Sequence, residues 1–82
     1  MLGEIDVYNA PQWEAEIRDW LSSGGRPVIE MSRVTFIDST GLNMLARVSE
    51  SHDQRLILRG VKPTIARLLD LTELDGLFTI IP

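Results

Sequence analysis

The stretch Arg33-Val34-Thr35-Phe36-Ile37-Asp38-Ser39-Thr40-Gly41-Leu42 contains the pattern that decides the fold. A run that favours extended structure, residues 34–37, stops at a cluster of small polar residues, 38–41, and a helical pattern begins at once. The cluster therefore lies where a strand turns into a helix. Side-chain oxygens at such a turn cap the free N–H groups of the first helical turn, and the helix dipole favours an anion there.

Two interpretations of this turn are open from the residues alone. In the first, Asp38, Ser39 and Thr40 serve only as helix caps, which is a common role for these residue types. In the second, Ser39 presents an exposed hydroxyl that a partner contacts or a kinase modifies. Phosphorylation would add roughly −1.5 to −2 units of charge, which disrupts a close-fitting partner while the helix N-terminus accommodates the phosphate. Gly41 would let a partner's backbone approach closely.

Length and composition predict one soluble intracellular domain, residues 1–82. The 82 residues carry a net charge of −4 and no cysteine, which excludes a disulfide scaffold and thiolate metal sites and fits the cytoplasm. No run of Lys or Arg accompanies exposed aromatic residues, so direct nucleic-acid binding is not expected. No stretch approaches the roughly 20 apolar residues that span a bilayer, and the N-terminus does not resemble a signal peptide.

Apolar runs alternate with amphipathic segments along the whole chain, which predicts parallel strands joined by helical crossovers. Of the two neighbouring runs 28–31 and 34–37, we expect the first to be the central strand and the second to be only an extended segment that delivers the turn. The expected order is a strand fragment at 3–7, a helix between Asn9 and residues 22–25, a strand at 28–31, the segment 34–37, a helix from Gly41 to about residue 51, a strand at 55–60, a helix opened by Pro63, and a strand at 77–81.

Helical spacing also predicts which side chains form the core. In the first helix the buried stripe is Trp13, Ile17, Trp20 and Leu21, since tryptophans at this spacing more often supply buried area than a ligand box. In the second helix, the expected buried face is Leu42, Leu45, Ala46 and Ser49, with Met44 and Val48 on its flank; in the third it is Ile65, Leu68, Leu69 and Leu71.

The residues needed for catalysis are missing. His52 is the one histidine, it lies at the polar end of a helical pattern, and no cysteine accompanies it. A zinc site and a Ser/His triad are therefore not expected. The segment 23–27 is rich in glycine but follows a helix and lacks the lysine of a phosphate-binding loop. We expect a binding module that needs no cofactor and no metal, rather than an enzyme.

Four segments in the same order resemble STAS domains, specifically the bacterial anti-sigma factor antagonists. Residues 34–42 resemble the family signature around Asp-Ser-Thr-Gly, and Gly3-Glu4-Ile5-Asp6 resembles its early Gly-Glu-Leu-Asp. Residues 25–32 and 69–78 resemble its central strand and its C-terminal helix and turn. The resemblance implies a small α/β fold with a mostly parallel or mixed central sheet of about four strands, covered by helices.

The resemblance also implies a function, namely a switch between partners. The hydroxyl that follows the aspartate is the phosphorylation site of the family, which is Ser39 here. The unphosphorylated antagonist binds an anti-sigma factor that is also a protein kinase, and a PP2C-type phosphatase reverses the modification. The partner surface implied for this chain includes Asp38, Ser39, Thr40, Gly41 and Met44, together with Asp6 near the same end of the sheet.

Compared with the family, the chain is expected to be truncated at its N- and C-termini. The expected absence of an N-terminal strand pair leaves a sheet edge open, which makes a homodimer one expectation. An alternative function is also open, because some STAS domains are subunits that are not phosphorylated, in lipid-transport ABC ATPase complexes or other signalling assemblies. In that case Ser39 is only a helix cap.

Overall fold

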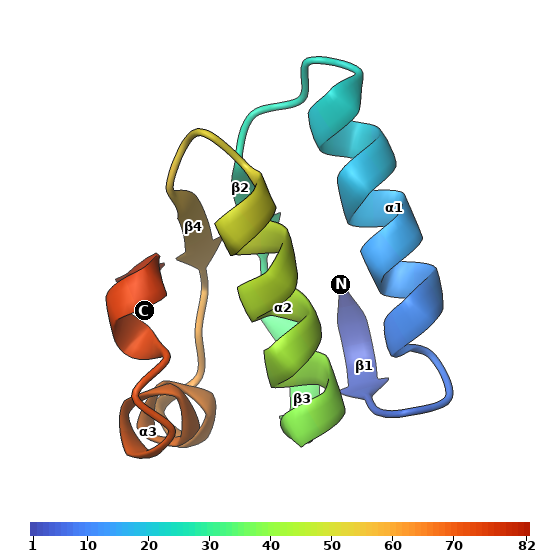
Figure 1. Cartoon of the computed structure of the whole chain (residues 1–82). Coiled ribbons are helices and arrows are strands. Elements are labelled where there is room, and N and C mark those ends of the chain that lie inside the picture. Colours follow the sequence, from blue (N-terminus) through green and yellow to red (C-terminus); the bar gives the residue numbers. More distant parts are fainter.

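Strands and helices alternate along residues 1–82, all of which the computed structural model describes (Figure 1). This alternation confirms the predicted α/β class. A single 3₁₀ turn, η1 (Asp75–Leu77), precedes the last strand. In chain order the other elements are β1 (Leu2–Ile5), α1 (Ala10–Ser22), β2 (Val28–Glu30), β3 (Arg33–Ile37), α2 (Ser39–Ser51), β4 (Leu56–Arg59), α3 (Pro63–Leu71) and β5 (Phe78–Ile81).

Every strand pair is parallel, as predicted. β1 pairs with β3, and β2, β4 and β5 form a second sheet in that order, with β4 in the centre. Only Met31 and Ser32 separate β2 from β3, so the chain itself joins the two sheets. The chain turns between β2 and β3, where the Val34 N–H donates to the Met31 carbonyl at 2.9 Å. This turn separates the two strands. The sequence predicted one central sheet of about four strands, whereas the structure has five strands in two sheets.

β3 is a full strand and not merely a connecting segment. It pairs in parallel with β1, from Leu2 opposite Arg33 to Ile5 opposite Ile37. The sequence-based assignment of residues 34–37 was wrong because β1, which supplies the backbone partners, lies far away in the chain. β2 was expected to be central but lies at the edge of its sheet, and β4 takes the central place.

The core lies between the sheets and the helices. Its 17 buried residues are all apolar, and every strand and every α-helix contributes to them. α1 and α2 pack side by side, and α3 lies on the side of α2 away from α1 (Figure 1). None of the three helices combines the length and apolar character that crossing a bilayer requires.

Trp20 departs from the predicted core stripe of α1. Ile17 is buried, whereas Trp13 is half-buried and the side chain of Trp20 is 54% exposed. The Trp20 indole N–H donates to the Arg26 carbonyl at 2.8 Å, and its ring lies against Gly25. An indole N–H needs a hydrogen-bond partner, and this one finds it in the loop after α1 rather than in the core.

Candidate functional site

Asp38 ends β3 and caps α2. Its backbone is extended, with φ −97° and ψ −177°, and its side chain accepts a hydrogen bond from the Gly41 N–H at 3.1 Å. Its carbonyl accepts from the Leu42 N–H at 3.0 Å, which begins the hydrogen bonding of the helix. The side chain thus satisfies one of the N–H groups that every helix leaves free at its start. The prediction of a strand-to-helix turn at this cluster is confirmed.

Ser39 is the first residue of α2 and is exposed. Since Asp38 provides the side-chain cap, the Ser39 hydroxyl is not needed to hold the helix start. Thr40, the next residue, is half-buried. An exposed hydroxyl at the positive end of a helix dipole is accessible to an enzyme, and the dipole favours a negative charge placed there.

Gly41 is buried and packs against the chain's own strands. A Cβ at this position would come within 2.7 Å of Ile37 Cγ1 and 2.9 Å of Ile5 Cγ2. The absence of a side chain therefore brings the first turn of α2 close to the β1–β3 sheet. Gly41 therefore has a role in internal packing, and the expectation that it lets a partner approach closely stays a prediction.

Met44 lies in the core, so the prediction that it contacts a partner is wrong for this structure. Its side chain is 0% exposed and Val48, one turn further along, is 1% exposed. Both were expected on the flank of the buried face. α1 packs alongside α2. The flank of α2 is therefore covered, in addition to the face of α2 that lies on the sheet. Ala46 and Ser49, expected on the buried face, are only half-buried.

Asp6 lies at the same end of the β1–β3 sheet as Asp38. The Asp38 N–H donates to the Ile5 carbonyl at 3.1 Å, so the residues that follow the two strands are neighbours. The Asp6 side chain accepts hydrogen bonds from the N–H groups of Tyr8 at 2.9 Å and Asn9 at 3.3 Å. The structure thus brings Asp6 together with the Ser39 turn and gives its carboxylate a role in holding the loop before α1.

Glu14 links α1 to α2. Its carboxylate is 2.8 Å from Arg47 on α2 and 2.9 Å from Arg18 on α1. The hydrogen bond from Arg47, with a smaller contribution from Arg18, lowers the pKa of Glu14 below its ordinary value. The i, i+4 spacing of Glu14 and Arg18 was visible in the sequence, whereas the contact between helices depends on the tertiary fold.

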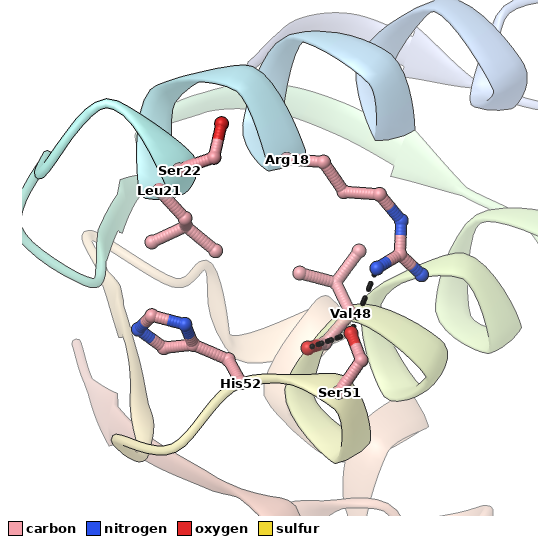
Figure 2. Close-up of a pocket in the computed structure, with 6 residues that line it drawn as sticks. All are labelled: Arg18, Leu21, Ser22, Val48, Ser51 and His52. Carbon is pink, nitrogen blue, oxygen red and sulfur yellow. Dashed lines mark hydrogen bonds between the residues drawn. The ribbon is translucent and has the colours of Figure 1, made fainter.

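A cleft of about 260 Å³ opens at the opposite end of α2. Figure 2 shows Leu21 pointing into it from α1 and His52 from the end of α2, with Arg18 and Ser51 at one side. The Ser51 hydroxyl accepts from Arg18 at 2.7 Å and donates to the Val48 carbonyl at 3.1 Å, so it is already engaged. No group of three His, Asp or Glu side chains is placed to hold a metal ion.

The sequence profile of the STAS domain family matches residues 1–82. The chain belongs to the STAS domain family. The match covers the strand-to-helix turn, its capping aspartate and the β1 segment beside it, which the structure places together. The predicted family is therefore confirmed.

Two similar proteins are named anti-sigma-B factor antagonists. The one from Staphylococcus aureus (strain NCTC 8325 / PS 47) is 30% identical over 82 aligned residues. The one from Staphylococcus epidermidis is 32% identical over 82 aligned residues. In both cases the alignment covers 95% of this STAS domain and 76% of the relative.

Proposed function

We propose that this STAS domain is an anti-sigma factor antagonist. It binds an anti-sigma factor and thereby frees a sigma factor for transcription. The observation that carries the proposal is the exposed hydroxyl of Ser39 at the start of a helix that Asp38 already caps. The staphylococcal relatives, named as antagonists of an anti-sigma-B factor, support the same function.

Phosphorylation of Ser39 controls this binding in the proposed switch. The anti-sigma factor is also a kinase: the Ser39 hydroxyl attacks the γ-phosphorus of ATP, the new P–O bond forms as ADP leaves, and the hydroxyl proton is released. A PP2C-type phosphatase returns the serine by hydrolysis. The phosphate adds roughly −1.5 to −2 units of charge on the partner-facing surface, and the positive end of the α2 dipole stabilises it internally.

The proposed partner surface surrounds Ser39. Asp38 and Thr40 flank the serine, and Asp6 lies at the end of the neighbouring strand. Gly41 shapes the surface from below by allowing α2 to pack closely on Ile5 and Ile37. The domain acts here as a binding module, with the kinase supplying the catalysis, and we place it in the cytoplasm because its proposed partner regulates transcription.

Phosphate mapping tests the proposal directly. The protein is incubated with ATP and the cognate anti-sigma factor, meaning the anti-sigma factor kinase of the same organism, and the modified residue is located by mass spectrometry. We expect one phosphate, on Ser39. The Ser39→Ala variant should bind the kinase but accept no phosphate, and Ser39→Asp should bind more weakly. Modification at no site, or only at sites away from Ser39 and Thr40, would contradict the switch.

The same variants separate the switch from the alternative of a constitutive subunit. In a lipid-transport ABC ATPase complex or another assembly that uses Ser39 only structurally, Ser39→Asp should leave complex formation intact. Neighbouring genes give an independent indication. A kinase and a sigma factor favour the switch, whereas an ABC ATPase and a permease favour the subunit.

A further inference from the structure

Tyr8 and Val7 project from the loop between β1 and α1. Tyr8 is 90% exposed, the highest value among the large apolar or aromatic side chains that are exposed, and Val7 is 57% exposed. Isolated apolar side chains are common on protein surfaces. These two are adjacent, and one is an aromatic residue that the fold leaves almost wholly without contacts. Val7 was expected in the strand fragment 3–7, but β1 ends at Ile5.

The loop that carries them is held in place at both ends. The Asp6 carboxylate accepts from the N–H groups of Tyr8 and Asn9, and the Asn9 side chain accepts from the Asp6 N–H at 2.9 Å. The Asn9 amide also donates to the Glu4 carbonyl at 2.7 Å. These bonds fix the backbone on both sides of Val7 and Tyr8, so presenting the two side chains requires little further ordering on binding.

This loop lies beside the Ser39 turn. Asp38 is hydrogen-bonded to Ile5 through the backbone, and Tyr8 follows Ile5 by three residues, which span at most about 11 Å. In Figure 1 the β1–α1 loop and the start of α2 lie at the same end of the molecule. An interface of ordinary size covers about 800 Å² per partner, roughly 30 Å across. One partner can therefore cover Ser39 and Tyr8 together.

We propose that Tyr8, flanked by Val7, is the apolar anchor of the surface that binds the anti-sigma factor. This inference rests on the proposed function and specifies the chemistry of the partner. The anti-sigma factor should offer an apolar pocket for the tyrosine ring. A basic rim should face the acidic end of this sheet, where Asp6 and Asp38 lie in a chain of net charge −4. A pre-positioned tyrosine suits this role because it buries a large area while losing few side-chain rotamers.

Affinity measurements with matched variants test the anchor. Binding of the unphosphorylated protein to the purified cognate anti-sigma factor is measured by calorimetry. Tyr8→Ala should weaken binding by about 10- to 100-fold, as for other buried interface aromatics, while Tyr8→Phe stays within about threefold. Leu71→Ala is the control, because Leu71 is 66% exposed and lies on α3, which Figure 1 shows on the other side of α2 from the β1–α1 loop. It should leave the affinity unchanged.

The outcomes separate this inference from the function on which it rests. Wild-type protein that binds, with Tyr8→Ala binding equally well, overturns the anchor and leaves the antagonist function standing. Equal weakening by Tyr8→Ala and Leu71→Ala also overturns it. A wild-type protein that shows no binding overturns the function and the anchor together. Because Tyr8 and Leu71 are both exposed, their substitution should leave the fold intact. Circular dichroism of each variant checks this.

A spectroscopic measurement gives a second, direct readout. Tyr8 is the single tyrosine of the chain, so 3-fluorotyrosine labelling yields one ¹⁹F resonance that reports on this ring alone. On addition of the anti-sigma factor, the resonance should shift and lose its sensitivity to a soluble paramagnetic quencher. A resonance that remains equally accessible in the saturated complex contradicts burial of Tyr8.

Discussion

The carboxylate of Asp38 accepts a hydrogen bond from the Gly41 N–H at 3.1 Å, which joins the cap of α2 to a position where that helix packs closely on the sheet. Ser39 and Thr40 lie between these two residues. The first turn of α2 is thus fixed by a cap on one side and by the core on the other. A chemical change at the exposed serine therefore alters the surface of the domain more than its fold.

Removing the cap should destabilise the domain. Asp38→Ala leaves the Gly41 N–H without its side-chain partner, and the expected loss is about 1 kcal/mol of unfolding free energy. Asp38→Asn is the matched control, because asparagine caps helices about as well as aspartate does. Urea denaturation measures both variants. Equal stability of Asp38→Ala and the wild type would show that the cap contributes nothing.

Adding a methyl group at Gly41 should also destabilise the domain. In Gly41→Ala the new Cβ would meet Ile37 Cγ1 at 2.7 Å and Ile5 Cγ2 at 2.9 Å, and overpacking of this kind costs about 1–3 kcal/mol. Alanine's higher helix propensity recovers only about 1 kcal/mol. Gly76→Ala is the control, since its added Cβ has nothing within 4 Å. Thermal unfolding should show a lower midpoint for Gly41→Ala alone, and equal midpoints for both variants would contradict the close packing.

A negative charge at Ser39 should leave the fold intact. Ser39→Asp places a carboxylate at the first residue of α2, where the helix dipole contributes about 0.3–1 kcal/mol of stabilisation. Repulsion from Asp38 opposes this effect, so we expect an unfolding free energy within about 1 kcal/mol of the wild type. Ser39→Ala serves as the uncharged reference in the same urea titration. Unfolding of Ser39→Asp under native conditions would mean that phosphorylation acts by disrupting the domain.

The Glu14 cluster predicts a loss of stability in acid. Hydrogen bonds and charge from Arg47 and Arg18 lower the pKa of Glu14 in the folded state. A lowered folded pKa contributes stability that is fully present above the ordinary value of 4.5 and is lost as the pH falls through the folded value. Unfolding free energies measured from pH 6 to pH 3 should therefore fall less steeply for Glu14→Gln than for the wild type.

Removal of the principal partner checks the cause of this effect. Because Arg47 makes the largest contribution, Arg47→Ala should flatten the same acid limb. The side chain of Arg47 is 56% exposed, so its loss should leave the core undisturbed. If the unfolding free energy of Glu14→Gln and of Arg47→Ala fell with decreasing pH as steeply as that of the wild type, other carboxylates would be responsible for the acid sensitivity.

The sequence predicted features that depend on local order along the chain. The small polar residues after residues 34–37, the helical periodicity and the alternation of strands with helices were enough for the strand-to-helix turn, the parallel pairing and the family. Its predictions of burial were less successful. Trp20 was assigned to the core but is 54% exposed, and Met44, placed on the flank of the buried face and among the partner contacts, is fully buried. Periodicity defines one face of a helix, but it does not show how many neighbours cover that helix.

The sequence by itself determined that a helix follows a strand at the polar cluster 38–41, because capping and the change of hydrophobic period depend on adjacent residues. Only the tertiary structure decided what surrounds it. The pairing of β1 with β3 brings Asp6 and the hydrogen-bonded loop of Tyr8 beside Asp38, and the packing of the elements buries Met44. These relationships join residues about 30 positions apart in the sequence. They exist only because strand pairing and helix packing bring distant parts of the chain into contact.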